Sequence, residues 1–312
     1  MKIRVVQNLG VTLGLMSMFV ILLSGCLPAS EPAPEGARIA PETSELATAR
    51  VNARLSEPGR ATVTGHNDLQ YIVNAAPSSD GLREIDTLLA AQSTCAVFVA
   101  EKAAKELDVP LTGATATAEF DETKQQVYVY VDLPGANSEQ VLDLANNLRQ
   151  RCPIYTTLAE AESVVFTPGE EFETATDDTI IVTATLTQFG RAQVNARGNS
   201  FVMDSVPPLD GPNEELNPLD MMLGGLAACG SFVYGSEDPL ADATVVVEAD
   251  FDPTGVRDLE GENPRIQNIR ISVQLDEYDE TQAERVEEQI KEQCHLYKIL
   301  SGSVNMEISM AP

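Results

Sequence analysis

Two stretches of the sequence, DTLLAAQSTCAVF (Asp86–Phe98) and DMMLGGLAACGSF (Asp220–Phe232), share one pattern. In each, the cysteine follows the aspartate by nine positions and the phenylalanine follows the cysteine by three. The residues between them are mostly small or apolar, which favours a buried helix. Because this pattern occurs twice in one chain, it indicates an internal repeat.

The elements that follow each stretch also repeat in the same order. The next strand ends in an acidic-Phe-Asp triplet, at 119–121 and again at 250–252. Strands of alternating polarity come next, at 127–131 and 269–273, and each is followed by an amphipathic helix. Both of these helices end in a cysteine, with a tyrosine three and a leucine six positions later: Cys152, Tyr155, Leu158 and Cys294, Tyr297, Leu300. We therefore predict two copies of one domain.

The domain boundaries follow from this repeat. We predict one domain at 47–167 and a second at 179–312. Between them, residues 168–178 are acidic and carry Pro and Gly, which is typical of a linker.

The N-terminus has the composition of a secretory signal. Lys2 and Arg4 precede an uncharged apolar run at 11–23, which is too short to span a bilayer comfortably. The run ends in Leu23-Ser24-Gly25-Cys26, which resembles the lipobox of bacterial lipoproteins. We therefore expect lipidation at Cys26; the alternative is an uncleaved anchor helix. Both interpretations place the body of the protein outside the cytoplasm.

The residues around the predicted cleavage site extend this interpretation. Residues 1–25 would be the signal peptide, and residues 26–46, rich in Pro, Ala and Glu, would form a flexible tether. The residue after the lipidated cysteine is Leu27 and not Asp. By resemblance to the known sorting rules of bacterial lipoproteins, this residue favours the outer membrane. The expected location is thus the periplasmic side of a bacterial membrane, with the lipid anchor as the membrane contact.

The composition excludes several functions. The net charge is −28, from 48 acidic and 20 basic residues spread along the chain, so nucleic acid is not an expected partner. His66 and His295 are the only histidines, and no cysteine spacing resembles a zinc motif, so we expect no metal. The sequence has no Gly-rich phosphate loop and no Ser/His/Asp arrangement, and no cofactor is expected.

Four cysteines remain besides Cys26, one early and one late in each repeat. One interpretation is two structural disulfides, Cys95–Cys152 and Cys229–Cys294, which an oxidising compartment permits. The other is thiol redox chemistry. A sulfenic acid formed on one thiol by a peroxide is converted to a disulfide by a second thiol nearby.

Each repeat also offers an arginine on a predicted hairpin and an aspartate on the cysteine helix. These candidates are Arg60 and Asp86, and Arg191 and Asp220. An arginine beside a buried thiol favours the thiolate, and a carboxylate can hold the guanidinium in position. Taken alone, each residue is also compatible with an ordinary surface or helix-start position.

Several of these motifs resemble the OsmC/Ohr family of small thiol proteins. The segment from Asn217-Pro218 to Asp220, followed by Ala228-Cys229, resembles the family's Asn-Pro-x-Glu…Ala-Cys helix. Arg151-Cys152-Pro153 resembles its Cys-Pro element, and Gly190-Arg191 its arginine hairpin. The resemblance covers both repeats.

This resemblance implies an α+β fold in which each domain has a curved antiparallel sheet around a central helix. Family members are intertwined dimers, so two fused copies imply a pseudo-dimer within one chain. The implied activity is reduction of organic hydroperoxides with an unidentified thiol reductant. Cys95 and Cys229 match the peroxide-attacking thiol, and Cys152 and Cys294 match the resolving thiol.

The sequence also departs from the family pattern. Asp86 and Asp220 stand where the family has glutamate, and the first repeat lacks Asn-Pro, with Arg83 nearby as a possible replacement for the hairpin arginine. His295 replaces the proline after Cys294. The second repeat is the better candidate for a working site. The alternative function is a non-catalytic envelope protein whose static disulfides support binding of a small apolar ligand or a protein partner.

Overall fold

The computed structural model describes residues 46–161, 163–168, 180–237, 243–257, 263–275 and 280–311. The predicted signal peptide, Cys26, the tether up to residue 45 and linker residues 169–178 lie outside the described residues.

The described part of the first half contains six strands and three helices. The strands are β1 (Ala47–Glu57), β2 (Arg60–Thr64), β3 (Gln70–Asn74), β4 (Thr115–Asp121), β5 (Gln126–Asp132) and β6 (Val164–Pro168). The helices are α1 (Glu84–Glu106), α2 (Ser138–Arg151) and α3 (Pro153–Glu160), and a short 3-10 turn, η1, covers His66–Asp68.

The second half repeats this order with one added helix, α5, after its fourth strand. Its strands are β7 (Ile180–Gln188), β8 (Arg191–Ala196), β9 (Asn199–Asp204), β10 (Thr244–Phe251), β11 (Ile266–Gln274) and β12 (Asn305–Ala311). Its helices are α4 (Pro218–Glu237), α5 (Pro253–Arg257), α6 (Glu280–Gln293) and α7 (His295–Ser301), with a 3-10 turn, η2, at Pro207–Leu209. The prediction of two α+β copies is therefore confirmed.

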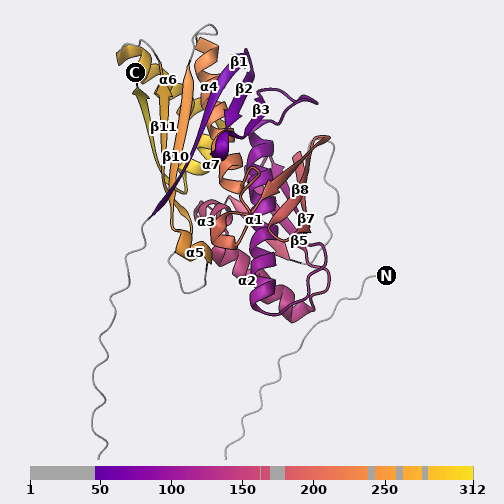
Figure 1. Cartoon of the computed structure of the whole chain (residues 1–312). Coiled ribbons are helices and arrows are strands. Elements are labelled where there is room, and N and C mark those ends of the chain that lie inside the picture. Colours follow the sequence, from indigo (N-terminus) through magenta and orange to yellow (C-terminus); the bar gives the residue numbers. More distant parts are fainter. Residues whose placement is uncertain are drawn as a thin grey trace, which may run out of the picture. The chain divides into compact units, whose positions relative to one another are not determined.

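Each of the two sheets combines strands from both halves. One sheet has the order β12-β11-β10-β1-β2-β3 and the other β6-β5-β4-β7-β8-β9. The junctions are antiparallel, with β1 beside β10 from Ala47 opposite Phe251 to Arg54 opposite Thr244, and β4 beside β7. In Figure 1 the indigo strands β1 to β3 accordingly lie next to the orange β10. The two halves have exchanged their N-terminal strands, as expected for an internal pseudo-dimer.

The sheets are mixed rather than wholly antiparallel. β5 pairs with β6 and β11 pairs with β12 in parallel register. In each case a pair of helices connects the two strands, and such a crossover is what parallel neighbours require. The alternation predicted at 127–131 is present, because Val127, Val129 and Val131 are buried while the residues between them are half-exposed.

The two long helices, α1 and α4, pack against each other and against strands of the opposite half. α1 contacts β7 and β8, and α4 contacts β1 and β2. The close approach of α1 and α4 depends on Gly225, since a Cβ there would overlap Thr87 Oγ1 and lie 3.0 Å from the Glu84 carbonyl oxygen. Almost every residue of α1 up to Ala104 is buried, which agrees with the apolar helix predicted from the sequence.

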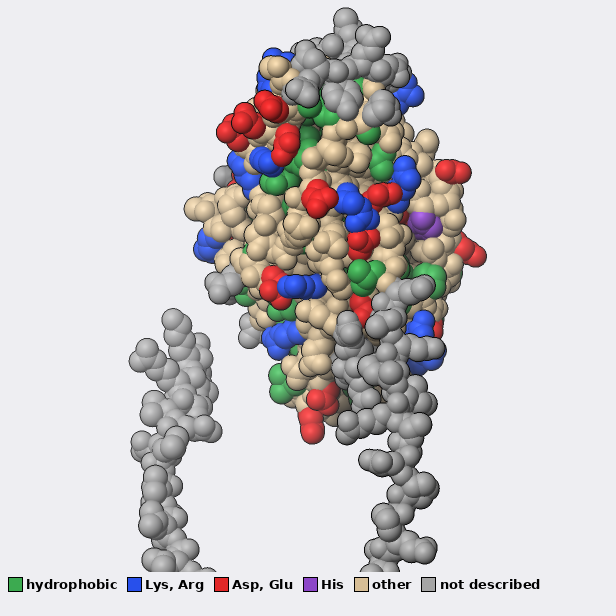
Figure 2. All heavy atoms as spheres, turned by 90° about the vertical axis from the view of Figure 1, so that its left-hand side faces the viewer, with side chains coloured by type: hydrophobic (Ala, Val, Ile, Leu, Met, Phe, Trp, Pro, Cys, Tyr) green, Lys and Arg blue, Asp and Glu red, His purple; other side chains and the backbone are tan. Residues whose placement is uncertain are grey.

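The face in Figure 2 carries acidic and basic side chains that alternate rather than one field of a single sign. Ion pairs of this kind also join neighbouring strands, since Arg270 of β11 pairs with Asp250 of β10 at 2.6 Å. None of the helices among the described residues has the length and apolar character needed to cross a membrane.

Candidate functional site

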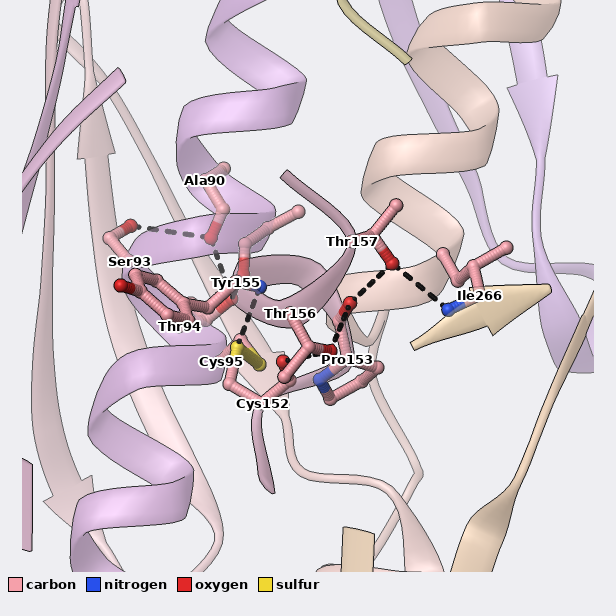
Figure 3. Close-up of a disulfide and its surroundings, with 11 residues drawn as sticks. Ala90, Ser93, Thr94, Cys95, Cys152, Pro153, Tyr155, Thr156, Thr157 and Ile266 are labelled. Carbon is pink, nitrogen blue, oxygen red and sulfur yellow. Dashed lines mark hydrogen bonds between the residues drawn. A yellow bond between two sulfur atoms is a disulfide. The ribbon is translucent and has the colours of Figure 1, made fainter. Parts of the chain in front are cut away.

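The first cysteine pair joins α1 to the start of α3. Cys95 and Cys152 form a disulfide with a Cα–Cα distance of 5.9 Å, and Figure 3 shows the bond between the two elements. Cys152 caps α3, where its Sγ accepts a hydrogen bond from the Tyr155 backbone N–H at 3.3 Å. Cys95 is 2% exposed and Cys152 is fully buried.

The second pair has the same construction. Cys229 of α4 and Cys294, which caps α7, form a disulfide with a Cα–Cα distance of 5.7 Å. The Sγ of Cys294 accepts from the Tyr297 backbone N–H at 3.4 Å. The repeated tyrosine three positions after each late cysteine therefore marks the first turn of a helix capped by that cysteine. Both pairings expected from the sequence are present.

The residue that precedes the late cysteine of the first pair is a buried, ion-paired arginine. Arg151, adjacent to Cys152, is fully buried. Its guanidinium donates to Glu106 at 2.6 and 3.2 Å and to the backbone carbonyls of Val256 and Arg257 in α5. Lys102, one turn before Glu106 on α1, pairs with Asp210 at 2.5 Å. Among the described residues, α5 has no counterpart in the first half.

The second pair opens on a pocket of about 200 Å³, which Cys229 itself lines. The pocket also includes Glu84 from the first half, together with Phe232, Ser236, Gln293 and His295. Ser236 and Gln293 occupy the repeat positions that Lys102 and Arg151 occupy in the first half. The two sites therefore differ at these positions, where the first half has ion-paired cations and the second half has small or neutral side chains.

The arginines predicted to serve the thiols lie elsewhere, which corrects that expectation. Arg60 pairs with Asp80 at 2.6 Å. Arg191 donates to Asp204 at 2.6 and 2.8 Å and to Glu214 at 3.0 Å. The cause is strand register, since Arg191 on β8 stands directly opposite Asp204 on β9, and Arg60 on β2 opposite Asn74 on β3.

Different residues hold the two helix aspartates. Arg197 donates from Nε to both carboxylate oxygens of Asp86, at 2.9 and 3.0 Å. The Nδ1 of His66 bonds to the Asp220 carboxylate, and its backbone N–H donates to Asp220 Oδ1 at 3.1 Å. In each pair the two partners come from different halves, which agrees with sites shared across a pseudo-dimer.

The partners of the two helix aspartates, His66 and Arg197, could have been found in the sequence. His66 follows Arg60 by six positions, and Arg197 follows Arg191 by six, so they occupy the same place in the repeat. Arg83, considered as a replacement arginine, instead caps α1 and donates its backbone N–H to Asp86 at 2.8 Å.

The surroundings of His66 favour its protonated form. Its Nδ1 faces the Asp220 carboxylate, with the Asn217 amide nitrogen also 3.3 Å away, and its Nε2 faces the Asn213 carbonyl oxygen at 3.1 Å. Both oxygens are acceptors, which favours a proton on each ring nitrogen. The hydrogen bond to Asp220 is the main cause that raises the pKa of His66 above its ordinary value. His66 thus replaces, in the second site, the permanent charge that Arg197 supplies in the first.

The aspartate pairs lie away from the sulfurs. Cys95 follows Asp86, and Cys229 follows Asp220, by nine helical positions, an axial distance of about 13.5 Å. The polar residues adjacent in sequence to the second disulfide are instead Gln293 and His295, and both line the pocket with Cys229. Within the part of the chain that the structure describes, no three His, Cys, Asp or Glu side chains gather as a metal site.

These features define a class: an α+β thiol–disulfide protein in which each central helix bears one cysteine of a buried pair. A profile of OsmC-like proteins matches residues 77–167 and 211–309, more than half of the chain. The chain therefore belongs to the OsmC-like protein family, with one copy of the domain in each half.

Solved structures of single-domain relatives match about one half of the chain each. The organic hydroperoxide resistance protein OsmC of Legionella pneumophila is 16% identical, with coverage of 44% of this chain and 100% of its own, and a TM-score of 0.34. An organic hydroperoxide resistance protein of Elizabethkingia anophelis is 15% identical, with coverage of 45% and 99% and a TM-score of 0.34. An OsmC-like protein of Mycoplasma pneumoniae is 14% identical, with coverage of 41% and 95% and a TM-score of 0.32. None of the curated proteins compared with the chain matches it.

Proposed function

We propose that the chain is a thiol-dependent peroxidase whose working site is the Cys229–Cys294 pair. The observation that carries this proposal is the pocket beside Cys229, because a hydroperoxide must reach the sulfur that it oxidises. Membership of the OsmC-like family and the presence of bonded cysteine pairs support a redox role in general.

The proposed reaction uses only the two cysteines. The Cys229 thiolate attacks the terminal oxygen of the hydroperoxide, so that an S–O bond forms, the O–O bond breaks and an alcohol leaves after taking up a proton. The thiol of Cys294 then attacks the sulfenic acid, releasing water and forming the disulfide. With a Cα–Cα distance of 5.7 Å, this second step needs no large backbone movement.

The first pair has a different role in this proposal. Cys95–Cys152 has a structural role in this proposal, because Arg151, which precedes Cys152, is fully buried and is bonded to Glu106 and to the backbone of α5. It closes a loop with a sequence separation of 57 residues. In the chain-entropy treatment, such a bond stabilises the fold by about 4 kcal/mol.

A test is to count thiols in the reduced protein after cumene hydroperoxide is added. We expect the rapid loss of two thiols. This loss should be abolished in Cys229→Ser and should still occur in Cys95→Ser. Thiols that react no faster than free cysteine would refute the peroxidase.

The location and partners form part of the same proposal. The substrate is a hydroperoxide, the reductant is a thiol compound, and Cys26 carries a lipid that holds the protein at the periplasmic side of the membrane. Labelled palmitate should enter the full-length protein in cells, and Cys26→Ser should prevent its incorporation. Incorporation that persists in Cys26→Ser would refute the anchor.

A second candidate function is binding of an apolar ligand with both disulfides static. It is favoured by a hollow of about 330 Å³ between the two halves, lined by Tyr71, Ile72, Leu82, Phe201, Leu216 and Met221 among others. Under this alternative, the reduced protein reacts with cumene hydroperoxide no faster than free cysteine, so the thiol count separates the two functions.

A further inference from the structure

Glu84 is an unusual component of the pocket beside Cys229. It belongs to α1 of the first half but lines the pocket of the second disulfide, and it is only 7% exposed. Its repeat counterpart is Pro218, so the carboxylate is present at one site only. Because it lies among the residues that surround the accessible sulfur, its charge acts on whatever approaches Cys229.

The hydrogen bonding of this carboxylate is incomplete. Its Oε2 is buried, and among the described residues it has no hydrogen-bond partner. Its Oε1 lies 3.8 Å from Arg83 Nη2 and 3.8 Å from His295 Nδ1, both beyond hydrogen-bond length. A buried carboxylate oxygen without a donor is unfavourable by the free energy of its lost hydration. A ligand that brings a positive charge into the pocket would stabilise this carboxylate and recover part of that free energy.

The other charges near the pocket leave this preference in place. Arg83 is the nearest permanent cation, but it does not line the pocket. His295 is 60% exposed at its side chain, so solvent screens it. Gln293 and Ser236 are neutral, and Ser236 already donates to the Val233 carbonyl at 2.7 Å. An anionic ligand would therefore meet the Glu84 carboxylate without a dedicated cation facing it.

We propose that Glu84 makes the Cys229 pocket selective by charge, so that it accepts neutral or cationic ligands with a hydrogen-bond donor and excludes carboxylates. This inference rests on the proposed function. For the reductant it specifies a small thiol that carries an amine. For the peroxide it specifies a neutral alkyl or aryl hydroperoxide rather than a fatty-acid hydroperoxide.

The reducing step balances as a thiol–disulfide exchange. A thiolate attacks Sγ of Cys229, the more exposed sulfur of the pair, forming a mixed disulfide and releasing Cys294 as a thiolate. A second molecule of the same thiol attacks the mixed disulfide and releases Cys229. Two thiols become one disulfide, the protein gains two electrons, and the two protons end on the cysteines.

The experiment compares three probes on the oxidised protein: cysteamine, 2-mercaptoethanol and 3-mercaptopropionate. The rate of reduction at Cys229–Cys294 is followed by alkylation and peptide mass spectrometry. Intrinsic thiol reactivity cancels when each probe is compared between wild type and Glu84→Gln. We expect the variant to lower the cysteamine to mercaptopropionate rate ratio by about tenfold. Glu122→Gln, an equal charge change at an exposed turn, should leave the ratio unaltered.

Two further results complete the test. Glu84→Asp keeps the charge and should keep the preference, which also covers the case in which Glu84→Gln fails to fold; if it loses the preference, charge is not the cause. An unchanged ratio in Glu84→Gln, with all three thiols reactive, overturns this inference alone. If no thiol reduces the pair, the proposed function fails together with the inference.

Discussion

The pair formed by Arg197 and Asp86 gives the sharpest prediction for stability. Asp86 is fully buried on α1, and Arg197 reaches it from the β8–β9 turn of the other half. Replacing Arg197 by Ala leaves a buried carboxylate whose charge is no longer balanced. Because the two partners belong to different halves, the loss also weakens the contact that holds the exchanged strands on the first half's helix.

The structure sets the size of the effect. Removing one partner of a fully buried ion pair destabilises a protein by about 3–5 kcal/mol. Here the Arg197 side chain is 27% exposed, and Asp86 keeps its hydrogen bond from the Arg83 backbone. We therefore expect Arg197→Ala to lower the free energy of unfolding by about 2–3 kcal/mol.

Arg60→Ala is the matched control. Its partner Asp80 is 59% exposed at the side chain, and exposed pairs contribute about 0–1 kcal/mol. Urea unfolding at pH 7 with the disulfides intact, followed by circular dichroism, measures both variants. Arg197→Ala should move the midpoint down by about 1 M and Arg60→Ala by much less. Equal shifts would refute the assignment of Arg197 as the partner of Asp86.

Three other predictions concern ionisable groups with defined partners. The pKa of His66 is raised above 6.5 in the folded state, so its bond to Asp220 stabilises the fold fully below pH 6.5. That contribution is lost as pH rises through the raised pKa, and thermal unfolding of His66→Gln should lack this part of the pH dependence; an unchanged profile contradicts it. Burial raises the pKa of Glu101 from 4.5 to about 7, so the fold loses stability between these values as pH rises. Glu101→Gln should flatten that decline, and a decline as steep as in wild type would count against it. Arg151→Ala should destabilise the protein by about 3 kcal/mol and speed reduction of Cys95–Cys152 by dithiothreitol. The exposed Arg149→Ala should do neither, and equal reduction rates for the two variants would mean that Arg151 does not protect the disulfide.

The sequence was sufficient for the features that depend on spacing. The Asp-to-Cys interval located both central helices, and the Cys-Tyr-Leu interval located the late cysteines, so the two disulfides could be paired before any geometry was known. The reason is physical, since a cysteine that caps a helix leaves its third following residue in the first turn, as Tyr155 and Tyr297 do.

The arginine assignments failed because register is a property of paired strands. Arg191 faces Asp204 only once β8 and β9 are aligned, and nothing local distinguishes Arg191 from Arg197 as the partner of a distant aspartate. His66 was missed because the residue at its position in the other repeat is an arginine, Arg197, and we compared the repeats by identical residues. The hydrogen bonds between Arg151 and α5 also could not be predicted from the sequence. α5 is an insertion in the other half, and it contacts Arg151 only in the folded chain.

The unequal accessibility of the two cysteine pairs is the central claim, and trapping of the sulfenic acid tests it most directly. Cys294→Ser and Cys152→Ser each remove one resolving thiol, so an oxidised partner cysteine persists and dimedone can label it. After reduction and one equivalent of cumene hydroperoxide, mass spectrometry should find the label on Cys229 in Cys294→Ser. It should find little or none on Cys95 in Cys152→Ser. Label on Cys95 at an equal rate, or none on Cys229, would contradict the account.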